Sequence, residues 1–325
     1  MATAAQSKQE GFAAFIKELV VLVLIVFLIR TFGFGLYQVP TGSMENKILV
    51  GERFFADKFS YIFTDPKAND IISFNAPNYI YSKNPLKYLW QKYVWGPQNW
   101  TKRVIATPGQ KVKGTVEDGK PVVYVDGKKL DELYMNKYPL IHVYLDDPGK
   151  IRKKAKKDAE NYVSQGRLRV SVMDQYIEQQ ERQSARWKSY DPTKPYDKQP
   201  FYDISPNRIV KDAQGNPEFL DPGTPLERNR WRDEAQHDGK NHWNGTDEFY
   251  VELGPDQYWV MGDNRQASQD SRFLGPIKRD LIHGKIIFRI WSNDSNEAWW
   301  IFDLIKHPIN FWKQMRWGRF FKRVT

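Results

Sequence analysis

A serine and a lysine have the sequence surroundings that nucleophilic chemistry requires. Ser43 stands in QVPTGSM (residues 38–44), where Pro40 fixes its own backbone and Gly42 permits a sharp bend. The loop could therefore hold the Ser43 hydroxyl in an exposed, pre-shaped position. PTGSM taken alone favours an ordinary turn serine, because a serine hydroxyl becomes a strong nucleophile only beside a general base.

Lys102 is the lysine for which the sequence indicates loss of hydration. TKRVIAT (residues 101–107) has the composition of a strand, in which Lys102 shares a face with Val104 and Ala106. An apolar environment disfavours the ammonium form, so it lowers the pKa and makes a neutral amine accessible near neutral pH. Most of the 49 lysine and arginine side chains are expected in water, so this hypothesis requires Lys102 to lie next to Ser43.

Other bases and metal sites have little support. The chain has no cysteine, which excludes thiol catalysis and thiolate metal ligands. Its five histidines are scattered, without the spacing of a metal-ligand pair or an evident acidic partner. The sequence therefore predicts no metal site, and lysine remains the established choice of base for Ser43.

A dense polar segment, GDNRQASQDSR (residues 262–272), follows a predicted strand. The carboxylates of this segment can pair with its guanidinium groups. Ser268 lies in the sequence between the first two charged residues and the last two. Taken alone, the segment could also be a polar loop whose surface ion pairs contribute little stability. The charged residues in question are Asp263, Arg265, Asp270 and Arg272.

Four segments together carry a specific resemblance. They are, in chain order, VPTGSM (39–44), NDIISF (69–74), KRVIATPGQKV (102–112) and GDNRQASQDSR (262–272). Their order after an apolar N-terminal run resembles the bacterial type I signal peptidases, membrane-anchored serine/lysine endopeptidases. The chain departs from the family pattern at Asn69, Ala106, Gln110, Gln266 and Ala267.

The resemblance implies removal of N-terminal signal peptides from exported preproteins by a Ser/Lys dyad, without a metal or organic cofactor. It implies Ser43 as nucleophile, Lys102 as general base, and the Thr41 hydroxyl with the Ser43 N–H as oxyanion hole. Ser268 would orient the lysine amine. Structural support around the site would come from Arg103, Asp263, Arg265, Asp270 and Arg272, and pockets for small substrate side chains from Tyr37, Val39, Met44 and Thr101.

The elements that must position these residues are mainly strands, since β-branched and aromatic residues recur between turn signals. We predict a mainly β fold with a coiled, antiparallel, barrel-like catalytic core in two parts, residues 36–130 and 246–295. Residues 131–245 are polar and form an inserted α+β or irregular lobe, with one helical section near residues 155–188. The strands are expected at residues 48–61, 69–76, 101–107, 110–116, 121–130, 248–254, 257–264 and 283–292.

The apolar run LVVLVLIVFLI (residues 19–29) is short for a membrane span and typical of a signal-peptide core. Extension through residue 37 gives sufficient length if Arg30 reaches the headgroups. Composition leaves a cleaved signal and a retained anchor equally open. The resemblance implies a retained transmembrane helix within residues 1–35, crossing the bacterial cytoplasmic membrane once, with the N-terminus inside and the catalytic domain outside.

The net charge of +10 fits either nucleic acid or anionic lipid as a partner. No nucleic-acid-binding motif accompanies it, so we predict membrane lipid and no nucleic acid. Aromatic and basic residues alternate in residues 78–100, where contact with a membrane interface and packing on the core are equally open. They alternate again in residues 296–325, where contact with a membrane interface is favoured. Two rival functions remain: another serine/lysine processing protease of this fold, or an inactive membrane-anchored binding protein.

Overall fold

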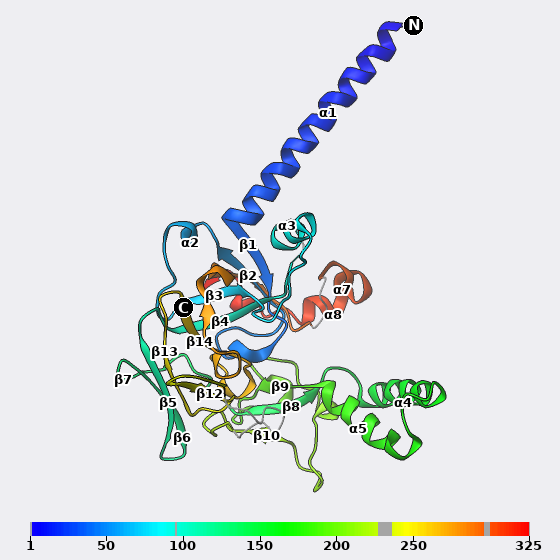
Figure 1. Ribbon diagram of the computed structural model, residues 1–325. Helices are drawn as coiled ribbons and strands as arrows, with labels where there is room; N and C mark the ends of the chain where they lie inside the picture. Colours follow the sequence, from blue (N-terminus) through cyan, green and yellow to red (C-terminus); the bar gives the residue numbers. More distant parts are fainter. Residues whose placement is uncertain (1, 95, 227–235, 296–299, 325) are drawn as a thin grey trace.

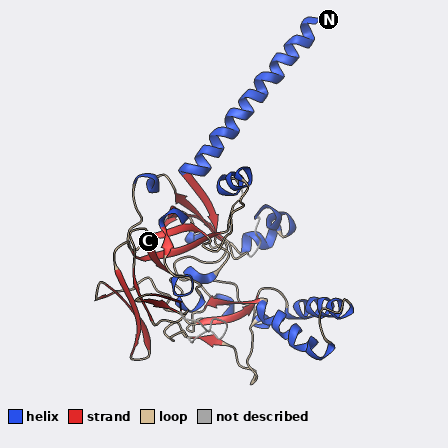
Figure 2. Cartoon of the chain, in the orientation of Figure 1, coloured by secondary structure: helices blue, strands red, loops and turns tan. Residues whose placement is uncertain are grey.

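Antiparallel sheets form most of the body of the molecule (Figure 1, Figure 2). The computed structural model describes residues 2–94, 96–226, 236–295 and 300–324. The largest sheet has eight strands, seven of them in the order β1 (Phe34–Gln38), β2 (Glu52–Asp57), β16 (Ile282–Ser292), β3 (Ile71–Asn75), β4 (Asn99–Ala106), β14 (Gln257–Met261) and β15 (Ile277–Lys278), with β17 (Lys322–Arg323) also on β16.

Two smaller sheets complete the strand pairing. The six-stranded sheet has the order β11 (Gln236–Asp238), β12 (Asn241–Trp243), β13 (Phe249–Glu252), β5 (Lys111–Glu117), β6 (Lys120–Val125) and β7 (Lys128–Lys129). The three-stranded sheet has the order β10 (Phe219–Leu220), β8 (Leu140–Tyr144) and β9 (Ala185–Ser189).

The predicted strand segments and the mainly β, antiparallel fold are confirmed, but the described sheets do not close into the barrel-like core that was expected. Within the described chain, the largest sheet ends at β1 and β15 and the six-stranded sheet ends at β11 and β7, so neither closes on itself. The reason is that alternating side chains indicate where strands lie but not which strands pair across the sheet.

Strand β4 runs through the interior and positions the lysine. All residues from Lys102 to Ala106 are buried. Ile105 and Ala106 belong to a core cluster around Trp259, and Val104 belongs to a second cluster with Phe74. A lysine in this strand is therefore held by core packing on a rigid element, which is the environment that its sequence predicts.

The N-terminal helix α1 (Ala2–Leu28) projects from the body and leads through a π-helical turn into β1 (Figure 1). The expected extension of the apolar segment through residue 37 is wrong, because residues 34–38 pair with β2 as a strand. Among the helices of the described residues, none joins sufficient length to sufficient hydropathy for crossing a membrane.

Residues 131–245, predicted as an inserted lobe, contain two helices rather than the single helical section expected. Helix α4 (Pro148–Ser164) begins at an Asp147 cap followed by proline, and α5 (Met173–Gln183) packs against it through Ile177. Residues 227–235 of the predicted lobe lie outside the described chain. The other helices are α2 (Ser60–Phe63), α3 (Pro85–Tyr93), α6 (Ser271–Leu274), α7 (Trp300–Lys306) and α8 (Pro308–Lys313).

Candidate active site

The structure brings Ser43 and Lys102 into direct contact, although they lie 59 positions apart in the chain. Ser43 is in the short 3-10 helix Gly42–Met44, and Lys102 comes from β4. Lys102 Nζ donates a hydrogen bond of 2.8 Å to Ser43 Oγ and a second of 3.1 Å to the carbonyl of Thr101. The expectation of an exposed Ser43 is wrong, since Ser43 and Lys102 are only 5% and 4% exposed.

Burial changes the acid–base character of Lys102. It lowers the pKa of the amine from 10.5 to about 8, while Asp270 acts to raise that pKa and Arg272 to lower it. At this pKa about a tenth of the lysine is neutral at pH 7, against less than a thousandth for a lysine in water. A neutral amine 2.8 Å from a hydroxyl can take its proton.

Asn264 fixes the orientation of the loop that carries Ser43. Its side-chain amide donates to the carbonyl of Gly42, and its backbone N–H donates to the carbonyl of Ser43, each at 3.0 Å. In a planar trans peptide the C=O and the N–H point in opposite directions. The Gly42 carbonyl points toward Asn264, so the Ser43 N–H of the same peptide points away from Asn264.

Glu45 ties the same loop to the inserted lobe. Its buried carboxylate accepts hydrogen bonds from the Ser189 N–H at 2.9 Å, from the Ser189 hydroxyl at 3.0 Å and from the Tyr202 hydroxyl. Burial raises the pKa of Glu45 to about 7, and the bonds from Tyr202 and Ser189 act against that rise. The lobe is thus hydrogen-bonded to a residue two positions from Ser43.

The other predicted polar neighbour, Ser268, lies close to Ser43 but is not bonded to the lysine. Its hydroxyl is buried, and in the described part of the chain it is not among the partners of Lys102 Nζ. A side chain at Gly262 would collide with the Ser268 side chain and with the carbonyl of Ser43. Glycine at 262 is what allows these two loops to approach.

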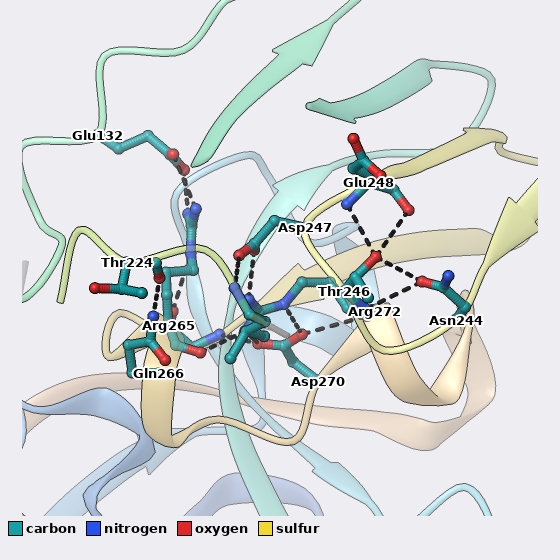
Figure 3. A network of polar contacts seen from close by, with 12 residues as sticks. Glu132, Thr224, Asn244, Thr246, Asp247, Glu248, Arg265, Gln266, Asp270 and Arg272 are labelled. Carbon is teal, nitrogen blue, oxygen red and sulfur yellow. Dashed lines mark hydrogen bonds and ion pairs between the residues drawn. The ribbon is translucent and has the colours of Figure 1, made fainter. Parts of the chain in front are cut away.

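A buried set of ion pairs supports the loop that follows β14 (Figure 3). Asp270 pairs with Arg272 at 2.8 Å, and Arg272 also contacts Asp247 at 2.7 Å. Arg103 makes two bonds of 2.7 and 2.8 Å to the carboxylate of Asp263, and Arg265 pairs with Glu132. These guanidinium groups are at most 3% exposed, so the alternative of weak surface ion pairs is excluded.

Breaking such buried pairs is expensive. Removing one member leaves an uncompensated charge, which typically costs about 3–5 kcal/mol. Arg272 lowers the pKa of Asp270 although burial acts to raise it, so the carboxylate stays ionised near Lys102. The arrangement fixes the loop and supplies negative charge that opposes complete loss of the lysine proton.

The predicted pocket residues come from β1, from the segment that follows it, and from β4. Val39 and Met44 are in one buried cluster, against which the partly buried Tyr37 packs. Thr101 precedes Lys102 in β4 and is partly exposed. Thr41 is exposed and borders a groove that Val39 also lines.

Four contributors to the site had no predicted role. Asn264 lies inside a matched segment, and Glu45 lies two positions from Ser43, so proximity in sequence could have indicated both. Glu132 and Asp247 lie outside the matched segments. Nothing in the sequence marks them as the partners of Arg265 and Arg272.

Comparisons with known proteins agree on one family. Residues 12–291 match the family model described as "Signal peptidase, peptidase S26". Signal peptidase I of Buchnera aphidicola (subsp. Acyrthosiphon pisum) is 27% identical over 286 residues, covering 86% of this chain and 75% of that relative. Probable signal peptidase I-2 of Synechocystis is 33% identical over 119 residues, covering 37% of this chain and 48% of that relative.

A solved structure described as a signal peptidase I from Enterococcus faecalis also matches. It has a TM-score of 0.25 and 16% sequence identity, and the match covers 69% of this chain and 97% of the other.

Proposed function

The chain belongs to the signal peptidase family, peptidase S26, and we propose that it removes signal peptides from exported preproteins with Ser43 and Lys102 as its catalytic dyad. The observation that carries this assignment is the 2.8 Å contact between Lys102 Nζ and Ser43 Oγ inside the protein. The pKa of about 8 at Lys102 supports a base that is available near neutral pH.

Acylation follows from this geometry. Neutral Lys102 accepts the hydroxyl proton as Ser43 Oγ attacks the scissile carbonyl carbon. The Ser43 N–H, whose direction Asn264 sets, and the Thr41 hydroxyl donate to the developing oxyanion. One such donor is typically worth about 2.7–4 kcal/mol of transition-state stabilisation.

The same lysine completes the cycle. Protonated Lys102 gives its proton to the leaving amine, which departs as the N-terminus of the mature protein. Lys102, neutral again, then takes a proton from water, and the resulting hydroxide equivalent attacks the acyl-enzyme ester. The signal peptide leaves with a free carboxylate, and Ser43 regains its proton from the lysine.

Substrate binding uses the edge of the largest sheet. Among the described strands, β1 pairs with β2 alone, so its other edge can take an extended peptide as an added strand. The side chains of Tyr37, Val39, Met44 and Thr101 then border the signal-peptide residues. Family membership suggests small side chains at the first and third positions before the cut.

A synthetic preprotein tests this function. The purified chain should release the signal peptide by one cut after a small residue, as judged by mass spectrometry. A substrate with phenylalanine at the first position before the cut should be processed at least about a hundredfold more slowly, because the pocket would have to expand. Equal processing of both substrates would contradict the pocket assignment.

We also propose that the protein is attached to a membrane through α1. The apolar run in α1 has exposed side chains from Leu19 to Val26. We place this helix in the bacterial cytoplasmic membrane, with the N-terminus inside and the sheets outside. Further exposed apolar side chains lie on elements outside α1, among them Leu86 and Trp90 on α3, and Ile305, Ile309 and Trp312 on α7 and α8. Residue 95, residues 296–299 and residue 325 of the predicted interfacial segments lie outside the described chain.

Vesicle binding tests the contribution of α7 and α8. A variant without residues 1–28 should bind phosphatidylglycerol vesicles, and Ile305→Glu with Ile309→Glu should weaken this binding at least about tenfold. Leu133→Glu with Val170→Glu, on the predicted inserted lobe, is the matched control, because it adds the same two charges at side chains that are 69% and 70% exposed, against 70% for Ile305 and Ile309. Equal weakening by the control, or no weakening by Ile305→Glu with Ile309→Glu, would contradict lipid contact at this surface.

A further inference from the structure

A groove separates the Ser43 loop from the inserted lobe. Its volume is about 620 Å³. One wall consists of residues 38–42 and Ala267, from the loops beside Ser43, and the other wall includes His142 and residues 185–188 of β9. The groove therefore begins at the proposed oxyanion residue Thr41 and continues onto the lobe.

The path of the substrate leads into this groove. Strand β1 runs from the base of α1 toward the Ser43 loop, and β8 and β9 lie at the opposite end of the body from α1 (Figure 1). A signal peptide whose apolar segment lies at the α1 end would run along β1 and be cut at Ser43. The residues after the cut must then continue away from α1, in the direction of the lobe.

The walls of the groove favour a particular chemistry. Trp187 stacks on His142 with ring centroids 4.4 Å apart, which gives a flat aromatic surface. His142 is already paired with Glu218, and Lys188 is paired with Asp294. The carboxylates of Glu218 and Asp294 therefore already occupy the polar atoms of His142 and Lys188.

Arg186 differs from its neighbours. It is exposed and lines the groove, and its guanidinium group donates to the carbonyls of Gln183 and Ala185 at 2.6 and 2.8 Å. Within the described ranges, no carboxylate lies at ion-pair distance from it. A guanidinium group with local acceptors and no acidic partner is suited to bind a carboxylate from another molecule.

We propose that this groove binds the first residues of the mature protein, after the cleavage site, and that Arg186 selects an acidic side chain among them. The inference rests on the proposed signal-peptide cleavage and assigns a substrate-binding role to the inserted lobe. Arg186 acts on substrate affinity and takes no part in the transfer of protons.

Matched peptides test the proposal. Synthetic preproteins carrying Asp or Asn at one of the first four positions after the cut differ only in charge. At low salt the wild-type chain should process the best Asp peptide about five- to tenfold better in kcat/KM than its Asn partner, mainly through KM. Arg186→Gln should bring this ratio to about one and leave the Asn peptide unchanged, and Arg186→Glu should favour Lys at that position.

Arg208→Gln is the control, because Arg208 is an exposed arginine of the same lobe that does not line the groove, and it should keep the wild-type ratio. An unchanged ratio in Arg186→Gln, or an equal loss on both peptides, would overturn the groove assignment while peptide cleavage persists. Failure of the wild type to cut either peptide would instead overturn the proposed function itself.

Discussion

Replacement of Lys102 by alanine should reduce kcat/KM for a synthetic preprotein by about a thousandfold or more. A general base typically contributes between about a hundredfold and ten-thousandfold, and Lys102 serves in both half-reactions. Its amine is the group bonded to Ser43 Oγ, and it lies 4% exposed in the core strand β4. No water molecule can replace it without entering that packed interior.

Two further variants separate chemistry from folding. Lys102→Met keeps most of the side-chain volume and should be as inactive as Lys102→Ala, since it restores packing without the amine. Lys113→Ala removes an exposed lysine from β5 and should retain full activity. Activity within tenfold of wild type in Lys102→Met would reject the assignment of this residue as the base.

Ser43→Ala should cause the largest loss, about 10⁵- to 10⁶-fold in kcat, as for nucleophile removal in other serine proteases. The variant should still bind preprotein, because the edge of β1 is unchanged. The assay is single-turnover cleavage with excess enzyme, alongside a binding measurement with a labelled signal peptide.

The double variant Ser43→Ala/Lys102→Ala provides the control. Residues that act as one unit are not additive, so the double variant should be no slower than Ser43→Ala alone. Additive losses would mean that the serine and the lysine act independently, which contradicts a dyad.

The sequence predicts the local features of this site well. Strands were located from alternating apolar residues, and the buried Lys102 follows from its place in the apolar strand TKRVIAT. These predictions succeed because strand propensity and the alternation of apolar residues depend only on neighbouring residues. The same dependence on neighbouring residues explains why the sequence predicts β1 as a continuation of the apolar segment, and why it does not divide the helical section near residues 155–188 into α4 and α5.

Contacts between segments far apart in the chain were harder to predict from the sequence. The open ends of the sheets depend on which strands meet, and the ion pairs of Arg265 with Glu132 and of Arg272 with Asp247 join segments far apart in sequence. The exposed position expected for Ser43 fails for the same reason. Its burial depends in part on Lys102 and on the loop carrying Asn264, neither of which is a sequence neighbour.

The charge state of Lys102 can be measured directly. In protein with isotope-labelled lysine side chains, the Lys102 signal is identified by its loss in Lys102→Met and followed by NMR from pH 6 to 11. We expect a midpoint at about pH 8, and kcat/KM should rise about tenfold per pH unit below that midpoint and level off above it, because the neutral amine is the active form. A midpoint near 10.5, the value of a lysine in water, would contradict the account, since the ammonium form would then persist wherever the enzyme works.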